Sequence, residues 1–251
     1  ICAELRHFEF SFADFADAEI LAAPFALNDA QRITARQYGF SSWQKLKSYV
    51  QHSSSSYNAA LAHKLVDAER AFEEEWTHLR SARTTRFDHR ILRLHQETAE
   101  LVTNCIEDEG WLDAGVAGHE GSEAAFKLVA NSYTQGPLNQ RVIKLMEKSV
   151  EDGRGAARGL GMLQDRALFL GGNPVIYGST GDFDEEGRLT IGNNVVDPDN
   201  LNRRRALAGF DAIEKDRQRI IETYAGQDSL LRPDPEQYAA DRQELAAVGN
   251  W

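Results

Sequence analysis

The sequence predicts a mainly α protein, in which a multi-helix bundle with one short β ribbon follows a small N-terminal helical module. Three observations indicate this fold class. Apolar residues recur every three or four positions along most of the chain, which is the period of amphipathic helices. Residues 175–191 combine β-favouring side chains with a loop rich in glycine and acidic residues, which favours a two-stranded ribbon. Residues 51–56 are polar and serine-rich, which is typical of a linker.

The composition argues against several classes of function. The 251 residues carry 28 Lys and Arg against 39 Asp and Glu, a net charge of -11, and such a surface repels a nucleic-acid backbone. No apolar run reaches the roughly 20 residues that cross a bilayer. Two cysteines, Cys2 and Cys105, are too few for a disulfide scaffold or a thiolate zinc site, which favours a reducing compartment. We therefore expect a cytoplasmic protein with no nucleic-acid or membrane partner, no cofactor and no metal.

The N-terminal module contains three short predicted helices. The first covers 17–23 and ends before Pro24, because the residue before a proline is disfavoured in helical geometry. The second begins at Asn28, a suitable N-cap, and ends at Gly39, a suitable residue just beyond a helix end. The third follows Ser41 or Ser42.

The larger domain begins with two long amphipathic helices. Their apolar stripes predict helices over 57–80 and 91–109, and the short break between them favours an antiparallel hairpin. Further helices are expected at 121–133, 137–152, 156–170 and within 199–224. The predicted organisation is the helical module at 1–50, the linker at 51–56, the helical domain at 57–225 with its ribbon near 175–191, and a C-terminal turn and peripheral helix at 226–251.

Residues 27–50 carry the pattern D-A-Q-x-x-x-A-R-x-x-G-F-x-S-W-x-x-L-K. This pattern is similar to a short helical module that precedes varied domains in bacterial proteins, and the resemblance implies no chemistry. We interpret Tyr38, Phe40 and Trp43 as its miniature core, because aromatic side chains at helical spacing usually bury area.

A second set of recognisable positions lies within 88–224. It comprises Gly110-Trp111, Gly118, Leu128-Val129, Gln140, Asp165-Arg166, Gly171 or Gly172, Tyr177-Gly178 and Arg203-Arg204. These positions resemble an uncharacterised bacterial family, domain-of-unknown-function family 6624. Members of that family typically show Gly-Trp-Pro, a Gln-His pair and Gln-x-Tyr-Gly-Thr-Gln, where this chain has Leu112, Ala130-Asn131, Val175 and Ser179. Because the differences lie at polar positions, the resemblance implies the fold rather than an activity or a substrate.

Asp165 and Arg166 are charged residues within an otherwise hydrophobic helix. A buried charge is tolerated only when it is paired or hydrogen-bonded. We interpret Asp165, with Arg166, Arg203 or Arg204, as a structural clamp between two helices, and a catalytic pair is the alternative. Tyr177 precedes the glycine-rich loop, where its hydroxyl could line a pocket.

Three other patterns partly match known sites. His119 begins His-Glu-Gly-Ser-Glu, but a zinc helix requires His where Glu123 stands, which favours a loop-to-helix cap. The acidic loop at 178–187 lacks the closing glutamate of a calcium loop and is interpreted as a hairpin loop. Arg90 and His95 have a spacing found in some helical ribonucleases, whereas the acidic chain favours a solvated Arg90 and a partly buried His95.

These observations predict a non-enzymatic, cytoplasmic bacterial protein that binds a small ligand or a protein partner in a cleft between the 57–110 hairpin and the ribbon-bearing part. The alternative is a hydrolase or transferase, of specialised metabolism or self-resistance, that uses carboxylate and tyrosine acid–base chemistry. A nuclease or a toxin–antitoxin partner is a third hypothesis. The residues expected to bind a ligand are Asp165, Arg166, Tyr177, Arg203 and Trp111. The candidate catalytic residues are Asp165, Tyr177 and His119.

Overall fold

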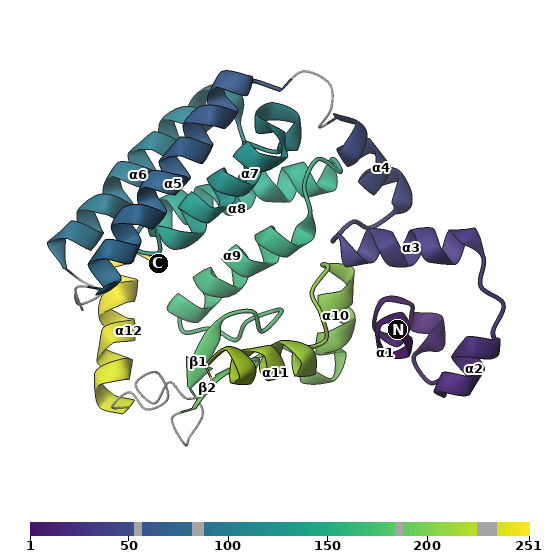
Figure 1. Cartoon of the computed structure of the whole chain (residues 1–251). Coiled ribbons are helices and arrows are strands. Elements are labelled where there is room, and N and C mark those ends of the chain that lie inside the picture. Colours follow the sequence, from purple (N-terminus) through teal and green to yellow (C-terminus); the bar gives the residue numbers. More distant parts are fainter. Residues whose placement is uncertain (53–56, 82–87, 184–187, 225–234) are drawn as a thin grey trace. The chain divides into compact units, whose positions relative to one another are not determined.

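The computed structural model describes residues 1–52, 57–81, 88–183, 188–224 and 235–251. It confirms the mainly α fold with one short two-stranded ribbon (Figure 1). The chain forms two compact units: unit 1 contains Ile1–Lys47 and Ala156–Arg242, and unit 2 contains Ser48–Gly155 and Gln243–Trp251. Residues 53–56 of the predicted linker and the predicted turn at 226–234 lie outside the described residues.

The N-terminal part of unit 1 is a series of short helices. Two of them are capped by carboxylates: the backbone N–H of Ala16 donates to Glu19 (2.6 Å), and that of Ala26 donates to Asp29 (2.9 Å). The predicted N-cap at Asn28 is therefore wrong: the N-cap is Ala26, two residues earlier, and the Asp29 carboxylate stabilises that helix start. The elements are α1 (Cys2–Phe8), the 3-10 helix η1 (Phe10–Phe12), α2 (Asp17–Ala22) and α3 (Leu27–Gln37).

Glu9 holds these short helices together. It is buried, and it accepts hydrogen bonds from Arg32 Nε (2.5 Å) and Ser11 Oγ (2.9 Å). Burial by itself raises the pKa of the Glu9 carboxyl, but the hydrogen bonds from Arg32 and Ser11 outweigh it, so the pKa lies below its ordinary value of 4.5. Glu9 is therefore an ionised, paired group in the folded protein at neutral pH.

The N-terminal helices pack against a segment that comes much later in the sequence. Phe8, Ile33 and Ala206 form one buried cluster. Gly39 and Gly209, with φ of 75° and 79°, bring two backbone segments into direct contact: a Cβ added at Gly209 would lie 2.6 Å from the Gly39 nitrogen. Only glycine fits there. The remaining elements of unit 1 are α9 (Ala157–Leu170), β1 (Gly181–Phe183), β2 (Leu189–Ile191), η2 (Pro198–Asn200), α10 (Leu201–Leu207) and α11 (Ile213–Tyr224).

The ribbon consists of β1 paired with β2 in antiparallel orientation. The sequence predicts the first strand over Val175 to Tyr177, and the structure corrects this detail. Val175 makes only an isolated parallel bridge to Val195. The N–H groups of Ile176 and Tyr177 donate to the side chain of Asp165 rather than to a neighbouring strand. A buried carboxylate on α9 has therefore replaced the strand partner.

Unit 2 is a helical bundle whose core follows the predicted stripes. Leu65, Phe72 and Leu79 on one helix, and Ile91 and Val102 on the next, are buried. Those two helices, α5 (Ala59–Ser81) and α6 (His89–Glu109), lie side by side as the predicted hairpin (Figure 1). Among the described residues, no helix combines the length and apolar character needed to cross a membrane. The elements are α5 (Ala59–Ser81), α6 (His89–Glu109), α7 (Ala114–Asn131) and α8 (Gly136–Glu151), while α4 (Trp43–His52) and α12 (Pro235–Gly249) contribute residues to both units.

Helix α7 begins earlier than the predicted 121–133 and has a kink. Asp113 caps its start by accepting a hydrogen bond from the Gly115 N–H (3.0 Å). Gly118 interrupts the helical geometry with φ 67° and ψ 175°. The Tyr57 ring packs so closely that a Cβ at Gly118 would lie 3.2 Å from it. His119 is consequently the first residue after the kink.

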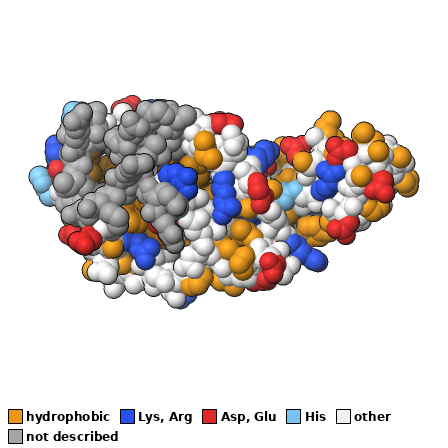
Figure 2. Space-filling view, turned by 90° about the horizontal axis from the view of Figure 1, so that it is seen from below, with side chains coloured by type: hydrophobic (Ala, Val, Ile, Leu, Met, Phe, Trp, Pro, Cys, Tyr) orange, Lys and Arg blue, Asp and Glu red, His pale blue; other side chains and the backbone are white. Residues whose placement is uncertain are grey.

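Several large hydrophobic side chains of the N-terminal helices are exposed, among them Leu21 at 75% and Leu27 at 73%. Figure 2 shows hydrophobic side chains gathered over α1 to α3. Tyr38 and Trp43 are also exposed, at 64% and 39%, whereas Phe40 is buried. The predicted miniature core is therefore wrong for Tyr38 and Trp43. The chain turns at Gly39, where the Phe40 N–H donates to the Ala35 carbonyl (2.8 Å), so Phe40 faces inward and its aromatic neighbours do not.

Candidate functional site

Asp165 is a fully buried carboxylate on α9 that organises the loop before the ribbon. Its Oδ1 accepts hydrogen bonds from the N–H groups of Ile176 (2.7 Å) and Tyr177 (2.9 Å). Its Oδ2 accepts from the N–H (2.7 Å) and the hydroxyl (2.8 Å) of Ser179. Hydrogen bonds to an ionised acceptor are the stronger kind, and here they compensate the burial of the charge.

Two arginines of α10 bind the carbonyl groups of the same loop. Arg204 Nε donates to the Ile176 carbonyl (3.1 Å). Arg205, which is fully buried, donates from Nη1 to the Tyr177 carbonyl (2.5 Å) and from Nη2 to the Asp216 carboxylate. We call Asp165, Arg204 and Arg205 the loop clamp. It joins α9 to α10 as the clamp interpretation expects, but through the loop backbone rather than through a direct ion pair.

Tyr177 belongs to the loop that the loop clamp holds, and its ring packs within unit 1. The ring stacks on Phe210 with centroids 5.3 Å apart. Burial raises the pKa of the Tyr177 hydroxyl, and the nearby Asp165 raises it further, with Arg204 opposing. Asp165 and Tyr177 are thus brought together, but the contact is made by the Tyr177 backbone.

The other predicted site residues lie elsewhere. Arg166 follows Asp165 on α9, whereas Arg203 lies over the Phe10 ring, 5.0 Å from its centroid, and takes no part in the loop clamp. Trp111 is buried in unit 2, and His119 is exposed there. The predicted set therefore divides between the two units. The predicted cleft between the 57–110 hairpin and the ribbon-bearing part also joins residues of different units and stays a prediction.

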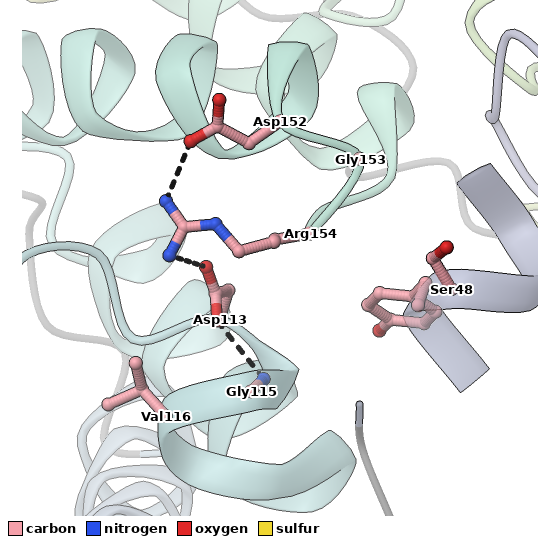
Figure 3. Close-up of a pocket in the computed structure, with 8 residues that line it drawn as sticks. Ser48, Asp113, Gly115, Val116, Asp152, Gly153 and Arg154 are labelled. Carbon is pink, nitrogen blue, oxygen red and sulfur yellow. Dashed lines mark hydrogen bonds and ion pairs between the residues drawn. The ribbon is translucent and has the colours of Figure 1, made fainter. Parts of the chain in front are cut away.

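Unit 2 contains a cavity of about 350 Å³, which we call the unit 2 pocket (Figure 3). Its lining comes from the end of α4, the start of α7 and the turn after α8. The lining residues are Ser48, Tyr49, Asp113, Gly115, Val116, Asp152, Gly153 and Arg154.

The polar wall of the unit 2 pocket is built around Asp113. Its side chain is 2% exposed, and its Oδ2 accepts a hydrogen bond from Ser149 Oγ (3.0 Å) and pairs with Arg154 Nη1 (3.4 Å). The other end of that guanidinium pairs with Asp152 (3.0 Å), so Arg154 lies between two carboxylates (Figure 3). Gly153, with φ 72°, ends α8 and directs Arg154 back over the pocket.

Tyr49 and His119 form a polar pair beside this wall. The Tyr49 hydroxyl and His119 Nδ1 are 3.0 Å apart, and their rings meet edge to face. Burial raises the pKa of Tyr49, and the charges of Asp113 and Glu123 raise it further. Tyr49 is therefore a neutral phenol at pH 7, and its hydroxyl shares this hydrogen bond with Nδ1 of His119.

Sequence reasoning missed Arg205 and most of the unit 2 pocket. Arg205 stands four residues after buried Leu201 on α10, so helical periodicity could have placed it on the inner face. Asp113 stands before a helix and Arg154 follows a glycine, which are local signals for a cap and a turn. No local signal joins Tyr49 to His119.

The remaining patterns have the following places. The guanidinium of Arg90 donates to Asp88 through Nε and Nη2, both at 2.9 Å. His95 is fully buried and shares a hydrogen bond with Thr134 Oγ1 (2.8 Å). Within the described ranges, no three His, Cys, Asp or Glu side chains are grouped to hold a metal ion. Residues 184–187 of the acidic loop lie outside those ranges.

Comparison of the chain with protein-family models, with curated proteins and with solved structures finds no match. The resemblance of 88–224 to family 6624 stays a prediction. The function is therefore inferred from the geometry of the two units alone.

Proposed function

We propose that the protein binds a small organic molecule in the unit 2 pocket. The observation that carries this proposal is a buried carboxylate, Asp113, at the wall of a cavity of about 350 Å³. Pockets that bind small ligands have volumes of roughly 300–1,000 Å³ and combine an apolar surface with a few fixed polar groups. Val116 supplies apolar surface here, and Tyr49 and Arg154 supply the other polar groups.

The charges of the lining favour a ligand with an ammonium or guanidinium group. Asp113 and Asp152 are two carboxylates against the single guanidinium of Arg154. Arg154 is 45% exposed, and ion pairs at such positions are worth only about 0–1 kcal/mol, so a ligand cation can compete for the carboxylates. The neutral Tyr49 phenol adds no opposing charge.

A thermal-shift screen with small amines, neutral amides and carboxylates tests this proposal. A ligand at 100 times its Kd stabilises the folded state by about 2.7 kcal/mol. We expect an amine to raise the unfolding temperature by about 5 °C or more at that ratio. Amides and carboxylates should have smaller effects at this pocket, measured as the part of the shift that Val116→Phe removes. Val116→Phe, which fills the cavity, should abolish the shift, while the same change at exposed Val50 should not.

Two results would contradict the proposal. One is the absence of a shift with every amine. The other is an equal shift in Val116→Phe and wild type, because binding would then lie outside the unit 2 pocket.

The Tyr49–His119 pair supports a second candidate, a hydrolase or transferase that uses acid–base chemistry. A phenol hydrogen-bonded to an imidazole can pass a proton to or from a bound substrate, and positioned groups of this kind contribute about 10²–10⁴ in rate. In an ester and amide hydrolysis screen, Tyr49→Phe and His119→Gln should each lower kcat about 100-fold or more. Tyr57→Phe is the matched control. Equal turnover in Tyr49→Phe and wild type would exclude this role.

A further inference from the structure

Unit 1 has a cavity of its own, of about 180 Å³, beside the loop clamp. We call it the unit 1 cavity. Its apolar surface comes from Phe210 and Ile191, which are buried, and from Met162 and Ile220 nearer to solvent. A protein cavity of about 150 Å³ can hold benzene, so this one has room for a single ring or a short branched chain.

Arg158 on α9 is the cationic group at this cavity that has no anionic partner. Within the described part of the chain it makes no ion pair, and its guanidinium lies 5.6 Å from the centroid of the Phe210 ring. That distance is within the range of a cation–π interaction, which can orient the guanidinium while leaving its N–H groups available.

The other charged residues of the lining are already paired with each other. Arg219 donates to Asp216 (2.7 Å) and to Asp211 (2.7 Å), and Asp216 also binds Arg205. Two arginines against one aspartate leave the lining with one net positive charge, in a chain whose net charge is -11. A bound monoanion would balance that charge.

We propose that the unit 1 cavity binds a monocarboxylate with a small apolar body, such as an aromatic carboxylate. The carboxylate pairs with Arg158, whose planar fork of donors matches both oxygens. The body of the ligand lies against Phe210 and Ile191. A dianion such as phosphate is disfavoured, because Asp216 lies in the same lining and Arg219 has donors committed to two aspartates.

Titration of the full chain with benzoate, followed by calorimetry or by NMR shifts, tests this inference. Loss of a charge-assisted hydrogen bond corresponds to about tenfold or more in Kd, so Arg158→Gln should weaken benzoate binding by at least that factor. Arg203→Gln is the matched control, because Arg203 is an exposed arginine of unit 1 over Phe10. Benzamide, the neutral counterpart of benzoate, should bind wild type about tenfold more weakly.

Met162→Glu is an independent second variant. It places a negative charge on a partly exposed lining residue, and it should weaken benzoate binding as much as Arg158→Gln does. Val116→Phe should leave benzoate binding unchanged, so the result is separate from that of the unit 2 pocket.

Three results would overturn the inference. The first is no benzoate binding to wild type at about 10 mM. The second is an equal Kd for wild type and Arg158→Gln. The third is a loss of binding in Val116→Phe, which would move the carboxylate to the unit 2 pocket.

Discussion

Replacing Asp165 should loosen the loop at 176–179 more than any change on the surface of unit 1. Asp165→Ala removes the acceptor of three backbone N–H groups and one hydroxyl. Asp165→Asn keeps the shape and one carbonyl oxygen, but turns an NH₂ group toward the donors of Ser179. Asp199→Asn is the matched control, because Asp199 is an exposed aspartate of the same unit.

The expected magnitudes follow from the number of hydrogen bonds lost. A hydrogen bond to a charged group contributes about 1.5–3 kcal/mol. The loop residues are half-buried and can regain water, so the lower value applies. Three backbone bonds then give about 4.5 kcal/mol for Asp165→Ala, and one backbone bond with the lost charge gives about 2 kcal/mol for Asp165→Asn. Asp199→Asn should stay within about 0.5 kcal/mol.

Amide hydrogen exchange is the suitable assay, because a chain with two units need not unfold in a single step. A change of about 2 kcal/mol corresponds to roughly 30-fold faster exchange from the opened loop. We expect that acceleration at Ser179 in Asp165→Asn, and smaller changes at Ile176 and Tyr177, whose acceptor oxygen is retained. In Asp165→Ala all three amides should exchange faster.

Two results of the exchange experiment would refute this reasoning. If Asp165→Ala exchanged at the wild-type rate, the carbonyl contacts from Arg204 and Arg205 would be sufficient to hold the loop. If Ile176 lost more protection than Ser179 in Asp165→Asn, the assignment of bonds to the two carboxylate oxygens would be wrong.

Three other predictions concern stability. Gly209→Ala should lower the free energy of unfolding, measured in urea, by at least about 2 kcal/mol more than Gly172→Ala does. Both glycines have positive φ, but only a Cβ at Gly209 would clash with another backbone segment. Equal losses in the two variants would contradict this close approach. Glu9 has a lowered pKa in the folded state, so the stability that its ionised form gives the fold is complete above pH 4.5 and is lost as the pH falls below that value. The difference in unfolding free energy between wild type and Glu9→Gln should therefore shrink from pH 7 to pH 3. A difference that stays constant over this range would exclude the linkage. Ser149→Ala should lower the stability measured in thermal unfolding by about 1–3 kcal/mol, because a buried oxygen of Asp113 loses its hydrogen-bond donor. An unchanged stability would mean that this hydrogen bond does not stabilise the fold.

Much of the fold was predictable because apolar periodicity directly reports burial. The stripe through Leu65, Phe72 and Leu79 could face only a core, and all three are buried. The aromatic residues Tyr38 and Trp43 misled the same reasoning, because a single turn at Gly39 decides which neighbours face inward. Apolar periodicity indicates which face of a helix is buried but does not indicate where the helix ends.

Contacts between distant segments explain what the sequence could not reveal. The strand predicted over Val175 to Tyr177 is displaced because Asp165 supplies the hydrogen-bond acceptors. Asp165 itself was predictable as a clamp, since a charge among leucines needs partners. The pairing of Tyr49 with His119 depends on how two helices lie together, which no spacing along the chain encodes.

The arrangement of unit 1 has a consequence for synthesis. Its first segment, Ile1–Lys47, leaves the ribosome long before Ala156–Arg242, which completes the unit. At about 5–20 residues per second, the early helices wait for roughly ten seconds or more without the partner that buries Phe8 and Ile33. Ser48–Gly155 emerges in between and can collapse first. The nascent chain thus carries uncovered apolar surface during that interval, which is the period when a chaperone would matter most.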